Sequence, residues 1–301
     1  MTHICLNMLV KNSGAVLRRS LESALPFIDS YVIVDSSSTD NTLDEITRAL
    51  GHLPGEVHGT CLEGLSDGFA ALRNLNLEKT RSFLCQVDDA YVLWLDAGRQ
   101  LAGALCPDLH ADGYTADVVV NGGAYGFPRT HLFKARSSWT WKYRAHETLV
   151  GGNASVPSGL EVHEWREGPT DREKYIRAAR LSELDMIDHD GDPRVVFYAA
   201  QNWFDAGEYQ NALDRYALRS GMAGYWDEIW YSAMREGMCF ELLGDTVSAA
   251  QCYEEAHELV PHRAEPCRHL ARMLSSQFWT DVADRIPWPG TGFLLERNAY
   301  Q

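Results

Sequence analysis

Short apolar runs alternate with helical patterns up to about residue 165 of this 301-residue chain, and this alternation constrains the fold most strongly. The predicted strands are His3 to Val10, Tyr31 to Val34, Val57 to Cys61 and Tyr91 to Leu95. Asn12 or Ser13, and then Ser38 or Asp40, can cap the helices that lie between the first three. Strands and helices in this order predict a mostly parallel sheet with right-handed crossovers. From Val118 to His163 the pattern changes to short strands and loops.

From Asp171 onward the sequence predicts helices throughout, with an internal repeat. Gly207 and Gly244 are 37 residues apart, as are the alanines at 212 and 249 and the tyrosines at 216 and 253. Glycine allows a tight turn between helices, and alanine allows two helices to approach closely. The spacing and residue types resemble the tetratricopeptide repeat. A plain helical bundle with coincidental spacing is the alternative.

The composition narrows the function and the compartment. A net charge of −15 argues against nucleic acid or an anionic membrane as a partner, although a small basic pocket for a phosphorylated ligand remains compatible with it. The seven cysteines are scattered and lack CxxC pairs, which indicates free thiols in a reducing compartment. No apolar run approaches the roughly 18 residues of a membrane span, and no signal-peptide pattern opens the chain. We therefore expect a cytoplasmic protein.

Two of the predicted strands end on a carboxylate. Asp96 follows the apolar run Tyr91 to Leu95, and Asp35 follows Tyr31 to Val34. In an open α/β sheet, ligands bind at the carboxyl ends of the strands. Hydroxyl residues after Asp35 open a helix whose free N–H groups suit a nucleotide, although Ser, Thr and Asp are also ordinary helix caps.

The order of motifs resembles the family-two inverting glycosyltransferases of the GT-A fold. The motifs that carry the resemblance are Ile4 to Asn12, Leu21 to Ser23, Val34 to Thr42, Ala70 to Asn76, Trp94 to Ala97, Trp141, Arg144 to Glu147 and Val162 to Glu164. It extends to the second half of the chain in a subgroup that has a C-terminal tetratricopeptide region and includes peptide and protein glycosyltransferases. The resemblance implies a Rossmann-like GT-A domain over residues 1–168, a tetratricopeptide-like domain over 169–278 and an irregular tail over 279–301.

The resemblance also implies which residues bind the donor, expected to be a UDP-sugar. Asp35 would contact the uracil or ribose, and Arg73 would lie near the donor phosphates. The remaining expected donor-site residues are Ser37, Asp40, Asn74 and Arg99.

A divalent cation, Mg²⁺ or Mn²⁺, is the expected cofactor, with Asp96 as a ligand and His163 as the second. Two departures from the family pattern bear on this expectation. The usual second acid of the metal motif is Gly98 here, and the usual acid after Asn12 is Ser13. Arg99 is therefore a candidate to replace part of the metal charge at the phosphates.

Glu147 is the expected catalytic base, with His146 supporting it or contacting the donor. An inverting transfer needs a carboxylate to take the proton of the acceptor nucleophile. Trp139 and Trp141 precede this pair at alternate positions, which suits either a sugar-binding surface or the core side of a strand.

The sequence therefore predicts a nucleotide-sugar-dependent glycosyltransferase whose helical domain recruits the acceptor, which is expected to be a peptide or protein. A degenerate transferase half that serves as a tetratricopeptide scaffold is the alternative. The helical domain is equally suited to forming a homodimer.

Overall fold

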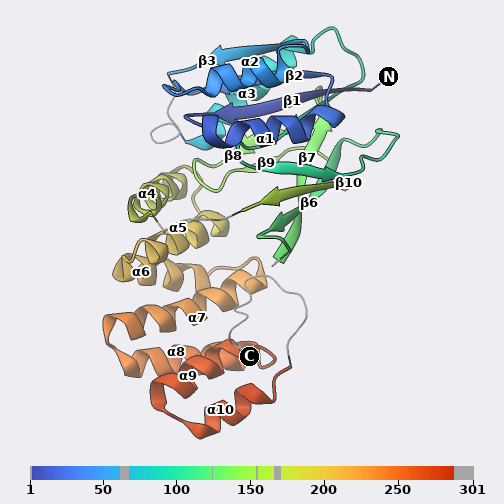
Figure 1. Ribbon diagram of the computed structural model, residues 1–301. Coiled ribbons are helices and arrows are strands. Elements are labelled where there is room, and N and C mark those ends of the chain that lie inside the picture. Colours follow the sequence, from blue (N-terminus) through green and yellow to red (C-terminus); the bar gives the residue numbers. More distant parts are fainter. Residues whose placement is uncertain (1, 62–67, 124, 154, 166–170, 288–301) are drawn as a thin grey trace. The chain divides into compact units, whose positions relative to one another are not determined.

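The computed structural model describes residues 2–61, 68–123, 125–153, 155–165 and 171–287 (Figure 1). The chain divides into two compact units, Met1–Pro169 and Thr170–Gln301, called here the sheet unit and the helical unit. The sheet unit combines helices and strands, and the described part of the helical unit contains helices and no strands. This is the α/β plus all-α architecture that the sequence predicts.

The sheet unit is built on an eight-stranded sheet within the described residues, in the order β3-β2-β1-β4-β7-β6-β10-β5. Its strands are β1 (His3–Val10), β2 (Ser30–Asp35), β3 (Gly55–Gly59), β4 (Ala90–Trp94), β5 (Gln100–Gly103), β6 (Gly113–Val120), β7 (Tyr125–Lys134) and β10 (Ser155–Glu164). The strands β8 (Thr140–Lys142) and β9 (Thr148–Val150) form a separate antiparallel pair. The helices are α1 (Gly14–Ala24), the short 3-10 helix η1 (Leu25–Phe27), α2 (Thr42–Leu50) and α3 (Phe69–Phe83).

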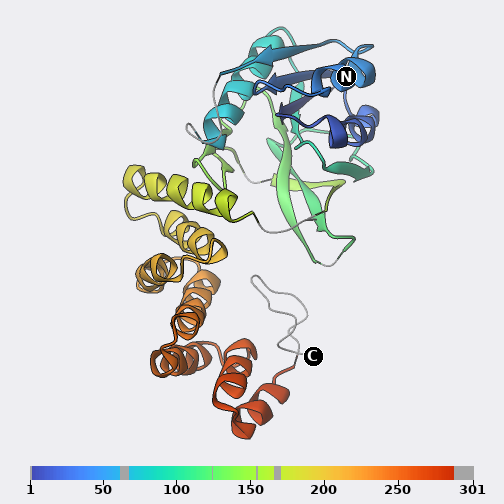
Figure 2. The same cartoon turned by 60° about the vertical axis from the view of Figure 1, so that its left-hand side comes forward.

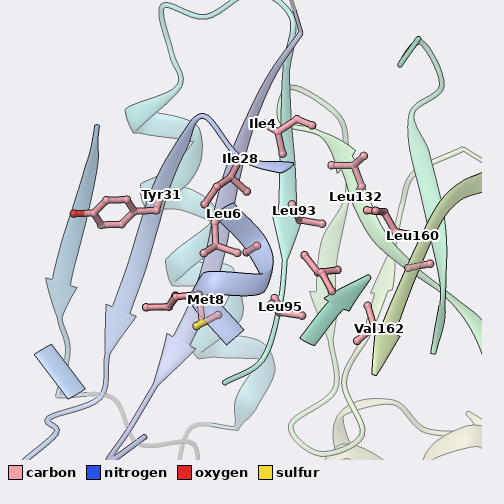
Figure 3. Close-up of a cluster of buried hydrophobic side chains, with 14 of the residues drawn as sticks. Ile4, Leu6, Met8, Ile28, Tyr31, Leu93, Leu95, Leu132, Leu160 and Val162 are labelled. Atoms are coloured by element: carbon pink, nitrogen blue, oxygen red, sulfur yellow. The ribbon is translucent and has the colours of Figure 1, made fainter. Parts of the chain in front are cut away.

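Helices cover both faces of the sheet. The side chains of each central strand point alternately to the two faces, so a helical layer covers each set of side chains. Figure 3 shows Ile4, Leu6 and Met8 of β1 among the side chains of one buried cluster. Leu17 of α1 belongs to that cluster together with several residues of α2. The intervening residue Cys5 belongs instead to the cluster that α3 covers. Because both faces are buried, β1, β2 and β4 are almost continuously apolar, as the sequence shows.

The strand order places a topological switch point beside β1. β2 and β3 lie on one side of β1, whereas β4 lies on the other, and these four strands are mutually parallel. The predicted parallel arrangement of the first four strands is therefore confirmed. Their carboxyl ends meet at one edge of the sheet, where a ligand crevice is expected in folds of this kind.

The rest of the sheet departs from a purely parallel arrangement. β7 is antiparallel to both β4 and β6, and β5 is antiparallel to β10. The segment Gln100–Gly103 is a strand that the sequence pattern does not indicate, because only Leu101 in it is buried. β3 runs over Gly55–Gly59, two residues before the predicted strand, and its mostly exposed residues reflect its place at the sheet edge.

In the helical unit each helix packs against the next one along the chain, as Figure 2 shows. The helices are α4 (Arg172–Asp188), α5 (Pro193–Asp205), α6 (Tyr209–Ser220), α7 (Trp226–Leu243), α8 (Thr246–Leu259), α9 (Glu265–Leu274) and α10 (Gln277–Asp284). None of the helices in the described residues is long and apolar enough to span a membrane.

The sequence repeat has equivalent structural positions in two helix pairs. Gly207 follows α5 and Gly244 follows α7, and both have a left-handed backbone, with φ of 76° and 89°. The alanines at 212 and 249 and the tyrosines at 216 and 253 are completely buried. The small side chain and the ring therefore occupy the same places in the packing of both pairs.

The helical unit extends further than the sequence predicts. An irregular tail is expected from residue 279, whereas Gln277–Asp284 form α10. This helix is ordered by packing, since Ala283 is buried with Ala264 and Cys267. Residues 288–301 of the expected tail lie outside the described residues.

The packing of β1 between two helical layers predicts where the sheet unit is most sensitive to truncation. Leu6 is completely buried in the core cluster, whereas 46% of Leu43 on α2 is exposed. We expect Leu6→Ala to lower the free energy of unfolding by about 2–5 kcal/mol and Leu43→Ala by less than about 0.5 kcal/mol, as measured by urea denaturation. Equal losses for the two variants would contradict the assignment of this core.

Candidate active site

Arg73 of α3 lies at the centre of a charged cluster beside the switch point. Its Nη2 donates to Oδ1 of Asp96 at 2.7 Å, and its Nε donates to Oε1 of Glu147 at 2.8 Å. Only 8% of the Arg73 side chain is exposed. One guanidinium thus joins the loop that follows β4 to the segment between β8 and β9.

Two indole rings hold the guanidinium of Arg73. Its Cζ lies 4.9 Å from the ring centroid of Trp94 and 4.7 Å from that of Trp141. The two rings meet edge to face, with their centroids 4.9 Å apart. A buried cation gains from such contacts, which also fix its orientation. Trp139 and Trp141 are both buried, so the core alternative of the sequence analysis holds for this aromatic pair.

The loop after β4 is attached to α1. The N–H of Gly98 donates to Oγ of Ser20 at 2.8 Å, and the N–H of Leu101 donates to Oγ of Ser23 at 3.0 Å. Between these anchors, Arg99 lies with Nη1 3.3 Å from Oδ2 of Asp96. Its Nη2 lies 3.3 Å from Oε2 of Glu164 at the end of β10. Both Asp96 oxygens are therefore engaged by arginines.

The antiparallel strand β7 contributes two more side chains. The guanidinium of Arg129 lies 4.8 Å from the Trp94 ring centroid, and its Nη2 donates to the backbone oxygen of Glu147 at 3.1 Å. His131 stacks on Trp94 and forms a 2.9 Å hydrogen bond between Nδ1 and the Trp94 backbone oxygen. The side chain of His131 is completely buried, and its Nε2 has no hydrogen-bond partner among the described residues.

The protonation states follow from burial and from these pairings. Burial alone would raise the pKa of Asp96, but the neighbouring Arg73 and Arg99 hold it well below its usual value. Burial acts to lower the pKa of Arg73, and the two carboxylates raise it above the ordinary value. Burial lowers the pKa of His131 to about 3. Near neutral pH the cluster therefore contains charged Asp96 and Arg73 beside a neutral His131.

The loop after β2 forms a hydrogen-bonded network with the start of α1. The carboxylate of Asp35 accepts from the N–H of Ser38, and Asp40 accepts from the N–H groups of Gly14 and Thr42. The hydrogen bond from the Thr42 hydroxyl is the largest cause of the lowered pKa of Asp40. Ser37 has a left-handed backbone, with φ of 60°, and donates to the Thr60 oxygen. Asp40 and Ser37 therefore shape the loop, while Asp35 lies at the strand end.

The segment that carries Glu147 is attached to α3. The side-chain amide of Asn74 accepts from the N–H of Trp141 and donates to its backbone oxygen, so Asn74 orients β8 and is not part of the charged cluster. The N–H of Phe69 donates to the oxygen of Arg144. Gly68 allows this approach, because it has a φ of 83° and a Cβ there would lie 2.5 Å from that of Arg144. The adjacent predicted residue, His146, has an exposed side chain.

The residues expected to bind a cation do not form a cation site. His163 pairs with Glu161 at 2.8 Å on the strand face opposite to Val162 and Glu164, since strand residues alternate. The acid that reaches the Asp96 loop is Glu164, through Arg99. Among the described residues, no group of three or more His, Cys, Asp or Glu side chains is placed to hold a metal ion. With both its oxygens engaged by arginines, Asp96 does not fit the expected Mg²⁺ or Mn²⁺.

The sequence thus predicts four members of the cluster as site residues and does not predict three others. The predicted members are Arg73, Asp96, Arg99 and Glu147. Glu164 follows the candidate His163 directly. Because adjacent strand residues lie on opposite faces, one of these two residues is expected to face the site. Arg129 and His131 alternate along a strand, and this is the only sequence signal that they face one side.

No family model matches this chain, and the comparison with curated proteins finds no match. Among solved structures, one of TarS from S. aureus in complex with UDP-GlcNAc aligns with 86% of this chain and 91% of that chain, at 12% identity and a TM-score of 0.44. Its UDP complex aligns with 93% and 90%, at 14% identity and a TM-score of 0.41. A longer TarS structure aligns with 83% of this chain at 11% identity and a TM-score of 0.43, and the present chain spans about half, 54%, of its length. Similarities this distant do not establish an activity for this chain, so the function is inferred from the residues of the site.

The pairings of Arg73 predict a large effect on stability. Removing a partner from a buried ion pair leaves an uncompensated charge, which costs about 3–5 kcal/mol. We expect Arg73→Ala to lower the free energy of unfolding by about this amount, as measured by chemical denaturation. The matched control is Arg18→Ala, which removes an exposed ion pair with Glu22 and should cost less than about 1 kcal/mol. A loss for Arg73→Ala as small as that of the control would contradict the role of Arg73.

Proposed function

We propose that this protein is a glycosyltransferase that moves a sugar from a nucleoside-diphosphate donor, expected to be a UDP-sugar, to an acceptor. The observation that supports this most strongly is the placement of Asp96 just after the carboxyl end of β4, beside the switch point, where Arg73 and Arg99 pair with it. This is where open α/β sheets bind nucleotides. The order of motifs in the sequence agrees with this placement.

The donor would bind across the ends of β1, β2 and β4. Asp35 would accept a hydrogen bond from the base or ribose, and the loop shaped by Ser37 and Asp40 would hold it in place. Arg73 and Arg99 would contact the phosphate oxygens, since a guanidinium can bind two oxygens at once. α1 begins at the same edge, where the positive end of its dipole favours an anion.

The transfer would invert the configuration of the anomeric carbon. The acceptor nucleophile forms a bond to that carbon while the bond to the donor phosphate oxygen breaks, and the electron pair leaves with the nucleoside diphosphate. Glu147 would take the proton from the nucleophile, with exposed His146 beside it. Arg73 pairs with both Glu147 and Asp96. This arrangement suits a base that acts on the acceptor and a carboxylate that lies on the diphosphate side.

The helical unit would recruit the acceptor. Its two equivalent helix pairs support a tetratricopeptide-like stack, and such stacks present surfaces that bind peptides or partner proteins. We therefore propose a peptide or protein acceptor, with the domain boundary near residue 168. Formation of a homodimer through the helical unit is the other role that its exposed apolar residues would serve.

A second candidate function is a scaffold built on a degenerate transferase fold. One observation favours it. Arg73 donates hydrogen bonds both to Asp96, the expected metal ligand, and to Glu147, the expected catalytic base. In an active enzyme, donor binding has to redistribute these contacts. In a scaffold they would stay as they are.

Nucleotide release separates the two functions. UDP- and GDP-sugars are incubated with the full chain, with and without Mn²⁺, and free nucleotide is measured. We expect release from at least one donor, and a loss of about 100-fold or more for Glu147→Gln, whose missing carboxylate cannot accept the proton. Asp44→Asn on the exposed side of α2 is the control and should retain full turnover. If no nucleotide is released and no nucleotide raises the melting temperature, the scaffold function is supported and the glycosyltransferase proposal is wrong.

A further inference from the structure

The backbone explains why position 98 has no acid. Gly98 has a φ of 90°, and its N–H is fixed to Ser20 on α1. A residue with a Cβ is strained in this conformation, whereas glycine adopts it readily. An aspartate at this position would adopt this strained backbone conformation in the loop that places Asp96. The loop conformation therefore disfavours the second carboxylate of a two-acid metal motif.

Arg99 lies between two carboxylates of the site. Its two terminal nitrogens lie 3.3 Å from the oxygens of Asp96 and Glu164. Arg73 takes the other oxygen of Asp96. A cation bound to Asp96 would lie close to both guanidinium groups, and like charges repel one another.

The cluster has bonding capacity left for an anion. The guanidinium groups of Arg73, Arg99 and Arg129 are balanced by the carboxylates of Asp96, Glu147 and Glu164, so the net charge favours neither sign of ligand. The sign of the ligand charge is then determined by the hydrogen-bond donors and acceptors of the cluster that have no partner. Nη1 of Arg99 is buried and has no hydrogen-bond partner among the described residues, because its approach to Asp96 is not aligned for one. A buried N–H donor of this kind is stabilised by a phosphate oxygen.

We propose that Arg99 takes the place of the divalent cation in the donor site, so that the diphosphate of the nucleotide binds without a metal. This inference rests on the proposed function, because it requires a nucleoside-diphosphate ligand. The guanidinium of Arg99 would retain its contact with Glu164 and turn its unused donor to the phosphates. Asp96 then positions Arg99 and Arg73 and is not a metal ligand.

The test measures UDP binding to the full chain by calorimetry, first with a chelator and then with Mn²⁺. We expect the two dissociation constants to agree within about threefold, because no cation is needed. Arg99→Ala should weaken UDP binding by about 10- to 100-fold, the range of one or two charge-assisted hydrogen bonds. Uridine, which lacks phosphates, should bind the variant as it binds the wild type. Arg136→Ala, which removes an exposed arginine, is the control and should bind UDP normally.

The outcomes separate the inference from the proposed function. UDP binding that requires Mn²⁺, or that survives unchanged in Arg99→Ala, overturns the inference and leaves the glycosyltransferase proposal in place. Failure of UDP and GDP to bind under either condition overturns the proposed function itself. Arg99→Lys retains the charge with fewer donors and should bind UDP between the wild type and Arg99→Ala. Should Arg99→Ala fail to fold, the comparison of chelator with Mn²⁺ on the wild type decides alone.

Discussion

The site depends on one buried cation, Arg73, which two carboxylates and two indole rings hold in place. α3 presents this side chain toward the carboxyl ends of the parallel strands, and the ion pairs join segments far apart in the sequence. Asp96 follows β4, whereas Glu147 lies between β8 and β9. Neither carboxylate is packed by a regular element of its own, so their relative placement depends on the guanidinium between them.

Burial of so many charges is possible because each has a partner. An isolated ion in a low-dielectric interior costs several kcal/mol, and this cost is offset only by well-placed opposite charges and hydrogen bonds. Although the whole chain has a net charge of −15, the cluster itself contains as many guanidinium groups as carboxylates. The acidic surface and the balanced site are therefore separate properties. Binding of an anionic donor would be governed by local hydrogen-bond donors.

Local sequence patterns predict the parts of the site that lie next to their strands. Asp96 can be predicted as a site residue because an apolar run leads directly to it. The parallel core of the sheet can be predicted from the alternation of strands and helices. Arg129 could not be predicted as a site residue, because β7 reaches the site by pairing with β4, a long-range contact that local periodicity does not encode. Glu164 enters the site through its contact with Arg99, which the sequence does not show. The sequence shows a glycine at position 98, and the positive φ of this residue favours glycine there. The place of Asn74 in a motif suggests a ligand contact, and the structure adds that its amide hydrogen-bonds to the backbone of β8.

A crystal structure of the full chain with UDP, grown first with a chelator and then with Mn²⁺, would show whether Arg99 binds the diphosphate without a metal. We expect the diphosphate to lie at the carboxyl ends of β1 and β4 in both crystals, with a phosphate oxygen within hydrogen-bond distance of Arg99 Nη1. Manganese is identified by its anomalous scattering. An anomalous peak between Asp96 and the diphosphate, with Arg99 displaced from Asp96, would contradict this expectation.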